Sequence, residues 1–172
     1  MGLRSSATLK WAVMFLVLYS TVRWQTKAKL PPDTCWADDQ RLLFATSKVT
    51  LAVKSSGRVK CLADLLQSMD YFAPNLPILV VDDGAHPMCK ALQSFARIPW
   101  LRLRLIQIDL DAGLSAGRNV LLDNVATEFV IFFDEDFLMT RKTNIAALIR
   151  VLNTLPSVMA VGGIVSDRKD FG

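Results

Sequence analysis

The chain has 172 residues, a formal net charge of +4, 52% hydrophobic residues and 21% charged residues. This length gives room for one domain around one main core, and the composition lies far from that of disordered chains. The basic residues are dispersed and form no run interleaved with aromatic side chains, so we expect no nucleic-acid partner.

Three cysteines and one histidine limit the chemistry further. Cys35, Cys61 and Cys89 have neither CxxC nor metal-ligand spacing, so the sequence implies neither a disulfide framework nor a zinc site. The single histidine, His86, stands beside Pro87 in an expected loop. A catalytic triad that depends on histidine is therefore not expected.

An apolar run at residues 11–22 lies between basic residues near the N-terminus. It is shorter than the roughly 20 residues of a full membrane span, although Lys10 and Arg23 can extend it by reaching towards the lipid headgroups. The residues alone leave a signal anchor and a cleaved signal peptide open. Residues 23–48 are polar, contain Pro31-Pro32 and show no sustained periodicity, so they are interpreted as a stalk.

From Val49 onward, short apolar runs alternate with helical patterns. The predicted strands are Val49–Val53, Ile78–Val81, Leu101–Ile108, Phe129–Phe133 and Val158–Val161. The apolar faces of two predicted helices are Val59, Leu62, Leu65, Leu66 and Met69, and Ile145, Leu148, Ile149 and Leu152. A shorter helix is expected from Ser115 to Asn124, with Ser115 as its cap. Strands that are apolar on both faces predict an α/β fold, with a mostly parallel sheet and helices on both faces.

Two acidic clusters follow two of the predicted strands. The carboxylates are Asp82 and Asp83 after one strand, and Asp134, Glu135 and Asp136 after another. Because the carboxyl ends of parallel strands border one crevice, all five are expected there. Like charges at close range repel one another unless a cation or hydrogen-bond donors compensate. Oxygen ligands suit Mg²⁺ or Mn²⁺, which keep positions open for phosphate oxygens.

The order of residues in the second cluster predicts different directions for its side chains. Alternate residues of an extended segment point the same way, so Asp134 and Asp136 are expected to face one ion while Glu135 turns elsewhere. For a single acidic residue after a strand, a turn or helix cap is the alternative interpretation, above all for Asp83-Gly84.

A third segment, Asp109–Asn119, follows the strand that ends at Ile108. Gly113 and Gly117 permit close approach to a ligand, and Arg118 offers a forked donor to phosphate or carboxylate. A glycine turn that leads into a helix is the alternative interpretation.

Together these segments resemble the GT-A glycosyltransferases with a family-2-like catalytic domain, and among them the β-1,4-N-acetylgalactosaminyltransferases. The matching stretches are Val49–Lys54, Val80–Asp83, Ala116–Asn119, Phe133–Phe137, Leu155-Pro156 and Val161–Gly163. The resemblance covers residues 49–163, with the order and spacing of the pieces kept. It implies the GT-A fold of the nucleotide-diphospho-sugar transferases.

The resemblance also implies a UDP-sugar donor and a divalent cation, Mn²⁺ or Mg²⁺. The implied donor-binding residues are Asp82, Asp83, Ala116, Gly117, Arg118, Asn119, Asp134 and Glu135. Among these, Asp82 and Asp83 would contact the uridine. Asp134 and Asp136 would form the metal-binding DxD motif, in which the last aspartate is the direct ligand.

The implied reaction transfers a sugar, with N-acetylgalactosamine as a candidate, to a glycan, glycolipid or glycoprotein acceptor with inversion. The family layout favours the anchor over the signal peptide and implies a single-pass type II Golgi membrane protein. Its parts would be a cytoplasmic tail at 1–10, a signal anchor at 11–22, a stalk at 23–48 and a lumenal donor-binding domain at 49–172.

Two departures from the family pattern leave alternatives open. The middle residue of the motif is Glu135, where the relatives have a run of aspartates. Family domains also continue with an acceptor half and a catalytic base, so we expect a truncated chain whose base lies beyond Gly172. The alternative is a catalytically inactive, membrane-anchored relative or fragment that binds nucleotide sugars.

Two other enzyme classes fit the motifs poorly. A haloacid-dehalogenase-type phosphatase needs Thr or Val two residues after the second aspartate, where this chain has Leu138. A Rossmann dinucleotide enzyme needs a glycine-rich turn after the first strand, and Lys54–Gly57 lacks that pattern.

Overall fold

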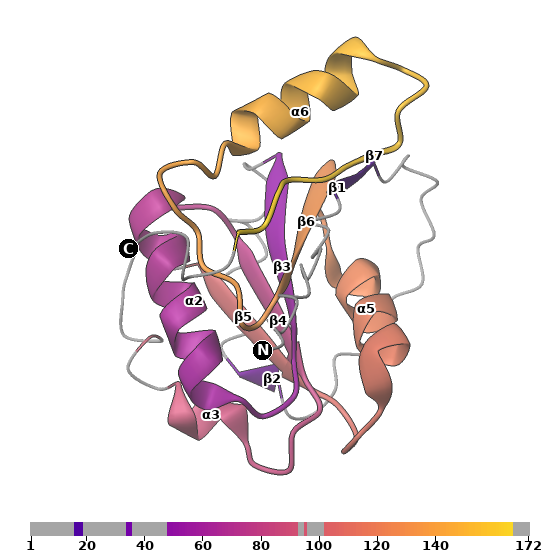
Figure 1. Ribbon diagram of the computed structural model, residues 1–172. Coiled ribbons are helices and arrows are strands. Elements are labelled where there is room, and N and C mark those ends of the chain that lie inside the picture. The colour runs from indigo at the N-terminus through magenta and orange to yellow at the C-terminus, as the bar shows by residue number, and fades with distance from the viewer. Residues whose placement is uncertain (1–15, 19–33, 36–47, 93–94, 96–101, 167–172) are drawn as a thin grey trace, which may run out of the picture.

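The computed structural model describes residues 16–18, 34–35, 48–92, 95 and 102–166 (Figure 1). Its strands are β1 (Leu16–Leu18), β2 (Thr34–Cys35), β3 (Val49–Ser55), β4 (Ile78–Asp82), β5 (Leu103–Gln107), β6 (Phe129–Asp134) and β7 (Ala160–Val161). Its helices are α2 (Val59–Phe72), α3 (Met88–Ala91), α5 (Gly113–Asn124) and α6 (Ile145–Thr154).

These strands form one sheet in the order β2-β5-β4-β3-β6-β1-β7. The four strands β5, β4, β3 and β6 are parallel to their neighbours and form its centre. The short strands β2, β1 and β7 pair antiparallel at the two edges. The α/β class and the mostly parallel sheet are therefore confirmed.

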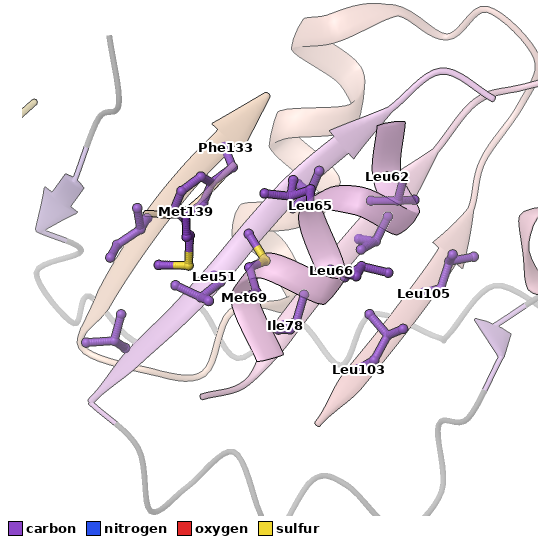
Figure 2. Close-up of a cluster of buried hydrophobic side chains, with 14 of the residues drawn as sticks. Leu51, Leu62, Leu65, Leu66, Met69, Ile78, Leu103, Leu105, Phe133 and Met139 are labelled. Atoms are coloured by element: carbon purple, nitrogen blue, oxygen red, sulfur yellow. The ribbon is translucent and has the colours of Figure 1, made fainter. Parts of the chain in front are cut away.

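Helices cover both faces of the sheet, as Figure 1 shows with α2 on one side and α5 on the other. On the α2 side, helix and strand side chains interlock in the larger core cluster (Figure 2). The labelled members are Leu51, Leu62, Leu65, Leu66, Met69, Ile78, Leu103, Leu105, Phe133 and Met139. The α5 side has a smaller cluster of Ala52, Leu79, Val81, Ile106, Leu121 and Val130. Because both faces are buried, neighbouring strand residues alternate between the two clusters, which explains the continuous apolar runs.

The register of the central strands brings the polar strand ends to one edge. Lys54 of β3 is paired with Asp134 of β6, and the next residue, Ser55, is paired with Asp82 of β4. Asp82 is paired in turn with Gln107 of β5. The carboxyl ends of all four central strands therefore meet where the site was expected.

Local boundaries differ from the sequence expectations in several places. The predicted helix at 115–124 begins at Gly113, and its cap residue is Ala112, which makes no side-chain capping bond. The prediction of Ser115 as a cap is therefore wrong, because Ser115 lies inside the helix. The helix α3 was not predicted, since four residues carry no measurable periodicity.

The predicted membrane anchor is not shown by the structure. Leu16–Leu18 forms strand β1 between β6 and β7, and the rest of 11–22 lies outside the described residues, as does the predicted tail at 1–10. In the part of the chain that is described, none of the helices has the length and apolar character needed to cross a bilayer. Of the predicted stalk at 23–48, Thr34–Cys35 forms the edge strand β2, Lys48 is described, and the remaining residues are outside the described ranges.

One expectation about the cysteines is corrected. Cys89, the second residue of α3, is disulfide-bonded, whereas Cys61 on α2 has a free thiol. Spacing along the chain could not reveal this bond, because a disulfide needs proximity in space and not a local motif.

Candidate functional site

The Asp82 carboxylate links the loop after β3 and the turn after β4 by hydrogen bonds. It is fully buried and accepts hydrogen bonds from the backbone N–H of Gly57 (2.8 Å), the backbone N–H of Gly84 (3.1 Å) and the side-chain amide of Gln107 (2.9 Å). The two glycines touch, because a Cβ on Gly84 would lie 2.5 Å from the Cα of Gly57. Asp82 therefore faces into the protein with both oxygens bonded.

Asp83 forms a buried ion pair with Lys54. The Lys54 ammonium lies 2.5 Å from Oδ1 of Asp83, and the two side chains are 8% and 3% exposed. Oδ2 of Asp83 accepts from the backbone N–H of Gly113 at 2.9 Å, so this carboxylate also ties down the start of α5. Burial alone would raise the pKa of Asp83, but the hydrogen bonds from Lys54 and Gly113 outweigh it and hold the pKa below its ordinary value.

Glu135 is buried while the aspartates on either side of it are exposed. Its Oε2 accepts from the Ser55 hydroxyl (2.5 Å) and from the backbone N–H of Ser56 (3.1 Å). Its Oε1 lies 2.5 Å from Nε of Arg58. This hydrogen bond to Glu135 raises the pKa of the Arg58 guanidinium. Glu135 thus holds the loop that follows β3.

Asp134 and Asp136 point outward at the same edge, with side chains 52% and 51% exposed. Asp134 lies 3.6 Å from Arg118, and Asp136 lies 3.4 Å from Arg58. Contacts of this length between half-exposed charges are weak. Glu135 points away from Asp134 and Asp136, as the sequence predicted. The cause is a turn and not the alternation of an extended strand. Strand β6 ends at Asp134, and the cluster continues in a turn closed by a hydrogen bond from the Phe137 N–H to the Asp134 carbonyl (3.0 Å).

The segment Ala116–Asn119 lies on α5 beside this edge. Gly117 is buried, and a Cβ at this position would collide with Cδ and Cε of Lys54. The missing side chain therefore makes room for the lysine that pairs with Asp83. Arg118 reaches Asp134, and its guanidinium lies 6.0 Å from the ring centre of Phe132. Ala116 is half-buried and Asn119 is exposed.

Sequence reasoning missed two cations of the site, Lys54 and Arg58. Lys54 carried a signal, since it is a single charge at the end of an otherwise apolar strand. Arg58 carried none, because its relation to Glu135 exists only through the pairing of β3 with β6. Among the residues that the structure describes, no group of three or more His, Cys, Asp and Glu side chains is placed to hold a metal ion.

A cavity of about 510 Å³ adjoins the exposed end of the site. Asp136 lines it together with Cys61 and Asp64 of α2, the segment after β6, the start of α6, and residues 163–166. Its walls include Phe133 and Phe137.

The mostly parallel α/β sheet, with acidic residues at the carboxyl ends of its central strands, agrees with the GT-A fold expected from the sequence. The model of "Glycosyl transferase family 2" matches residues 59–172. The chain therefore belongs to glycosyl transferase family 2.

Among characterised proteins, the chain is similar to β-1,4 N-acetylgalactosaminyltransferase 2 of Mus musculus. The two are 32% identical over 117 residues, which is 68% of this chain and 21% of that protein. It is 29% identical over 123 residues to β-1,4 N-acetylgalactosaminyltransferase 1 of Homo sapiens, covering 72% of this chain and 21% of that protein. The chain spans about a fifth of the length of these relatives.

Two solved structures share the fold. The mannosyltransferase PcManGT from Pyrobaculum calidifontis, in complex with GDP-Man and Mn²⁺, has a TM-score of 0.56 at 23% identity, with 61% of this chain and 32% of that chain covered. TarS 1–349 from S. aureus, in complex with UDP, has a TM-score of 0.53 at 23% identity, with 63% and 32% covered. At this identity the similarity shows the fold alone.

Proposed function

We propose that this chain is the donor-binding part of a metal-dependent glycosyltransferase that uses a UDP-sugar. The proposed sugar is N-acetylgalactosamine, and the proposed acceptor is a glycan, glycolipid or glycoprotein. The names of the curated relatives support the sugar, and the UDP and GDP-Man bound to proteins of the same fold support a nucleotide-sugar donor.

One observation carries the proposal: three of the five carboxylates at this edge are buried and bonded to protein donors, while Asp134 and Asp136 are exposed. Three cations, Lys54, Arg58 and Arg118, contact the cluster, so its five carboxylates leave a formal charge of −2. A divalent cation would match that charge at the two exposed carboxylates.

The residues fit such a cation by their chemistry. Asp134 and Asp136 offer only carboxylate oxygens, the ligands that Mg²⁺ and Mn²⁺ prefer, and their contacts to arginine are long enough to be exchanged. Asp134 and Asp136 would hold the metal, with Asp136 as the direct ligand. When bound, the cation neutralises charge on the departing diphosphate.

The chain's own residues then position the donor. Asp82 and Asp83 fix the loops on either side of the strand ends. They are also the proposed uridine contacts, and because both carboxylates are buried and bonded within the protein, such a contact requires one of those bonds to be exchanged for the uridine. Gly117 leaves space for Lys54. Arg118 and Asn119 border the UDP-sugar and offer it the N–H groups of a guanidinium and an amide. Most of the acceleration would come from positioning and charge stabilisation, and direct displacement by the acceptor hydroxyl would invert the anomeric centre.

The proposed location is the Golgi membrane, with the domain on the lumenal side. The disulfide bond at Cys89 supports an oxidising compartment, because such bonds are rare in the cytosol. Membrane attachment through residues 11–22 remains a prediction.

Replacing Asp136 tests the proposed function. We expect the wild-type chain to bind UDP in titration calorimetry with Mn²⁺ and to bind it far more weakly with EDTA. Asp136→Ala should abolish the manganese-dependent part of binding, because the metal loses its direct ligand. The matched control is Asp123→Ala, which removes an exposed aspartate of α5.

Equal affinity of wild type and Asp136→Ala in the presence of Mn²⁺ would remove the metal role. Hydrolysis of a UDP-sugar distinguishes the alternative function. Slow metal-dependent hydrolysis indicates a transferase, whereas binding without any hydrolysis indicates an inactive nucleotide-sugar-binding relative.

A further inference from the structure

Arg58 stands between two carboxylates with different exposure. Its Nε lies 2.5 Å from Oε1 of the buried Glu135, and its Nη1 lies 3.4 Å from Oδ2 of the exposed Asp136. The Arg58 side chain itself is 53% exposed. One end of the guanidinium is therefore fixed inside the protein while the other end faces the proposed metal ligand.

Glu135 is suited to hold Arg58 in this orientation. Its other oxygen is occupied by the Ser55 hydroxyl and the Ser56 N–H, so the carboxylate cannot turn without losing these bonds. Because the Glu135 side chain is only 3% exposed, solvent screens its pair with Arg58 less than it screens a surface pair. The contact with Asp136 is longer and exposed on both sides, so it is the weaker of the two.

We propose that Arg58 is a diphosphate-binding residue of the donor site, held in place by Glu135, that exchanges its contact with Asp136 for the diphosphate when the donor binds. The proposal rests on the proposed function. A guanidinium has five N–H donors in a planar fork that matches phosphate oxygens, and the two carboxylate contacts use only two of them. If Asp136 held a cation, the outer end of Arg58 would lose this contact and would be available to a diphosphate.

A purely structural role for Arg58 makes a different prediction. If Arg58 served only to neutralise Glu135, its loss would lower the stability of the loop after β3 and weaken all nucleosides alike. Comparing UDP with uridine separates the two roles, because uridine lacks the diphosphate.

The test measures the affinity of the 172-residue chain for UDP and for uridine by titration calorimetry at saturating Mn²⁺. We expect Arg58→Ala to weaken UDP binding about tenfold and to leave uridine binding within about twofold, since a charge-assisted hydrogen bond is lost only with the diphosphate. Arg58→Lys should recover part of the loss, because it keeps the charge but lacks the fork. Arg150→Ala removes an exposed arginine of α6 and should leave both affinities unchanged.

A second variant addresses folding, because Arg58→Ala leaves a buried carboxylate with fewer partners. Arg58→Ala combined with Glu135→Gln removes both charges and should show the same loss of UDP affinity relative to uridine. An equal reduction for UDP and uridine, or no reduction for UDP, would overturn the proposal. Failure of the wild-type chain to bind UDP at all would instead overturn the proposed function.

Discussion

At the scale of single residues, the five acidic side chains at the sheet edge have separate roles. Asp82, Asp83 and Glu135 are buried and bonded to the protein, whereas Asp134 and Asp136 are exposed. The sequence identified all five as members of one edge, because their positions after apolar strands follow from periodicity. It could not show which of them the protein neutralises, because those bonds depend on Lys54, Arg58 and the packing of loops.

The buried pair of Asp83 with Lys54 predicts a dependence of stability on pH. The folded-state pKa of Asp83 is below its unfolded value, so its ionised form stabilises the fold above the unfolded pKa of about 3.9, and this contribution is lost as the pH falls through the folded pKa. We expect Asp83→Asn to lower the free energy of unfolding by about 3 kcal/mol at pH 7, because the buried Lys54 ammonium loses the negative charge that compensates it.

Urea denaturation at a series of pH values checks this prediction. The difference in free energy of unfolding between wild type and Asp83→Asn should shrink as the pH falls below about 4, where the Asp83 carboxyl of the unfolded chain takes up a proton, and should be lost as the pH falls through the lower folded-state pKa. The exposed Asp123→Asn should change stability by less than about 0.5 kcal/mol throughout. If the difference in free energy of unfolding between wild type and Asp83→Asn does not change with pH, the charge of Asp83 does not stabilise the fold.

At the scale of elements, the central strands and the long helices were predictable and the turns were not. β3, β4 and β6 agree with the predicted runs within two residues, because strands buried on both faces are apolar throughout. The turn after Asp134 and the start of α5 at Gly113 depend on individual backbone conformations. Gly113 has a φ of 90°, a left-handed conformation that glycine adopts at little cost.

Gly117 of α5 provides a prediction at this scale. Alanine at an ordinary helix position stabilises by about 1 kcal/mol relative to glycine. Here the added Cβ would collide with the Lys54 side chain, whose ammonium is held by Asp83 and by the Ser55 carbonyl. Because Lys54 cannot move aside without weakening these bonds, we expect Gly117→Ala to destabilise by about 1–3 kcal/mol instead.

Thermal denaturation of Gly117→Ala and Ser115→Ala compares two positions on one helix. Ser115 is exposed and caps nothing, so its replacement should be neutral within about 0.5 kcal/mol. If Gly117→Ala is at least as stable as wild type, the absence of a side chain at Gly117 is not required for the packing of Lys54.

At the scale of the whole molecule, the sequence predicted the fold class and the meeting of the acidic strand ends at one edge, but not the outer strands of the sheet. β1 and β2 fall in segments interpreted as anchor and stalk, and two or three residues give too little periodicity to predict a strand. The disulfide bond of Cys89 was missed for a related reason, since it depends on contacts distant in sequence.

The central claim is that a divalent cation at Asp134 and Asp136 joins this chain to the diphosphate of a UDP-sugar. A crystal structure of the 172-residue chain grown with UDP and Mn²⁺ tests it most directly, with anomalous diffraction recorded at the manganese edge. We predict a manganese peak bound by Asp136, with the diphosphate as its neighbour and Arg118 beside it. Ordered UDP away from this edge, or manganese without contact to Asp134 and Asp136, would contradict the account.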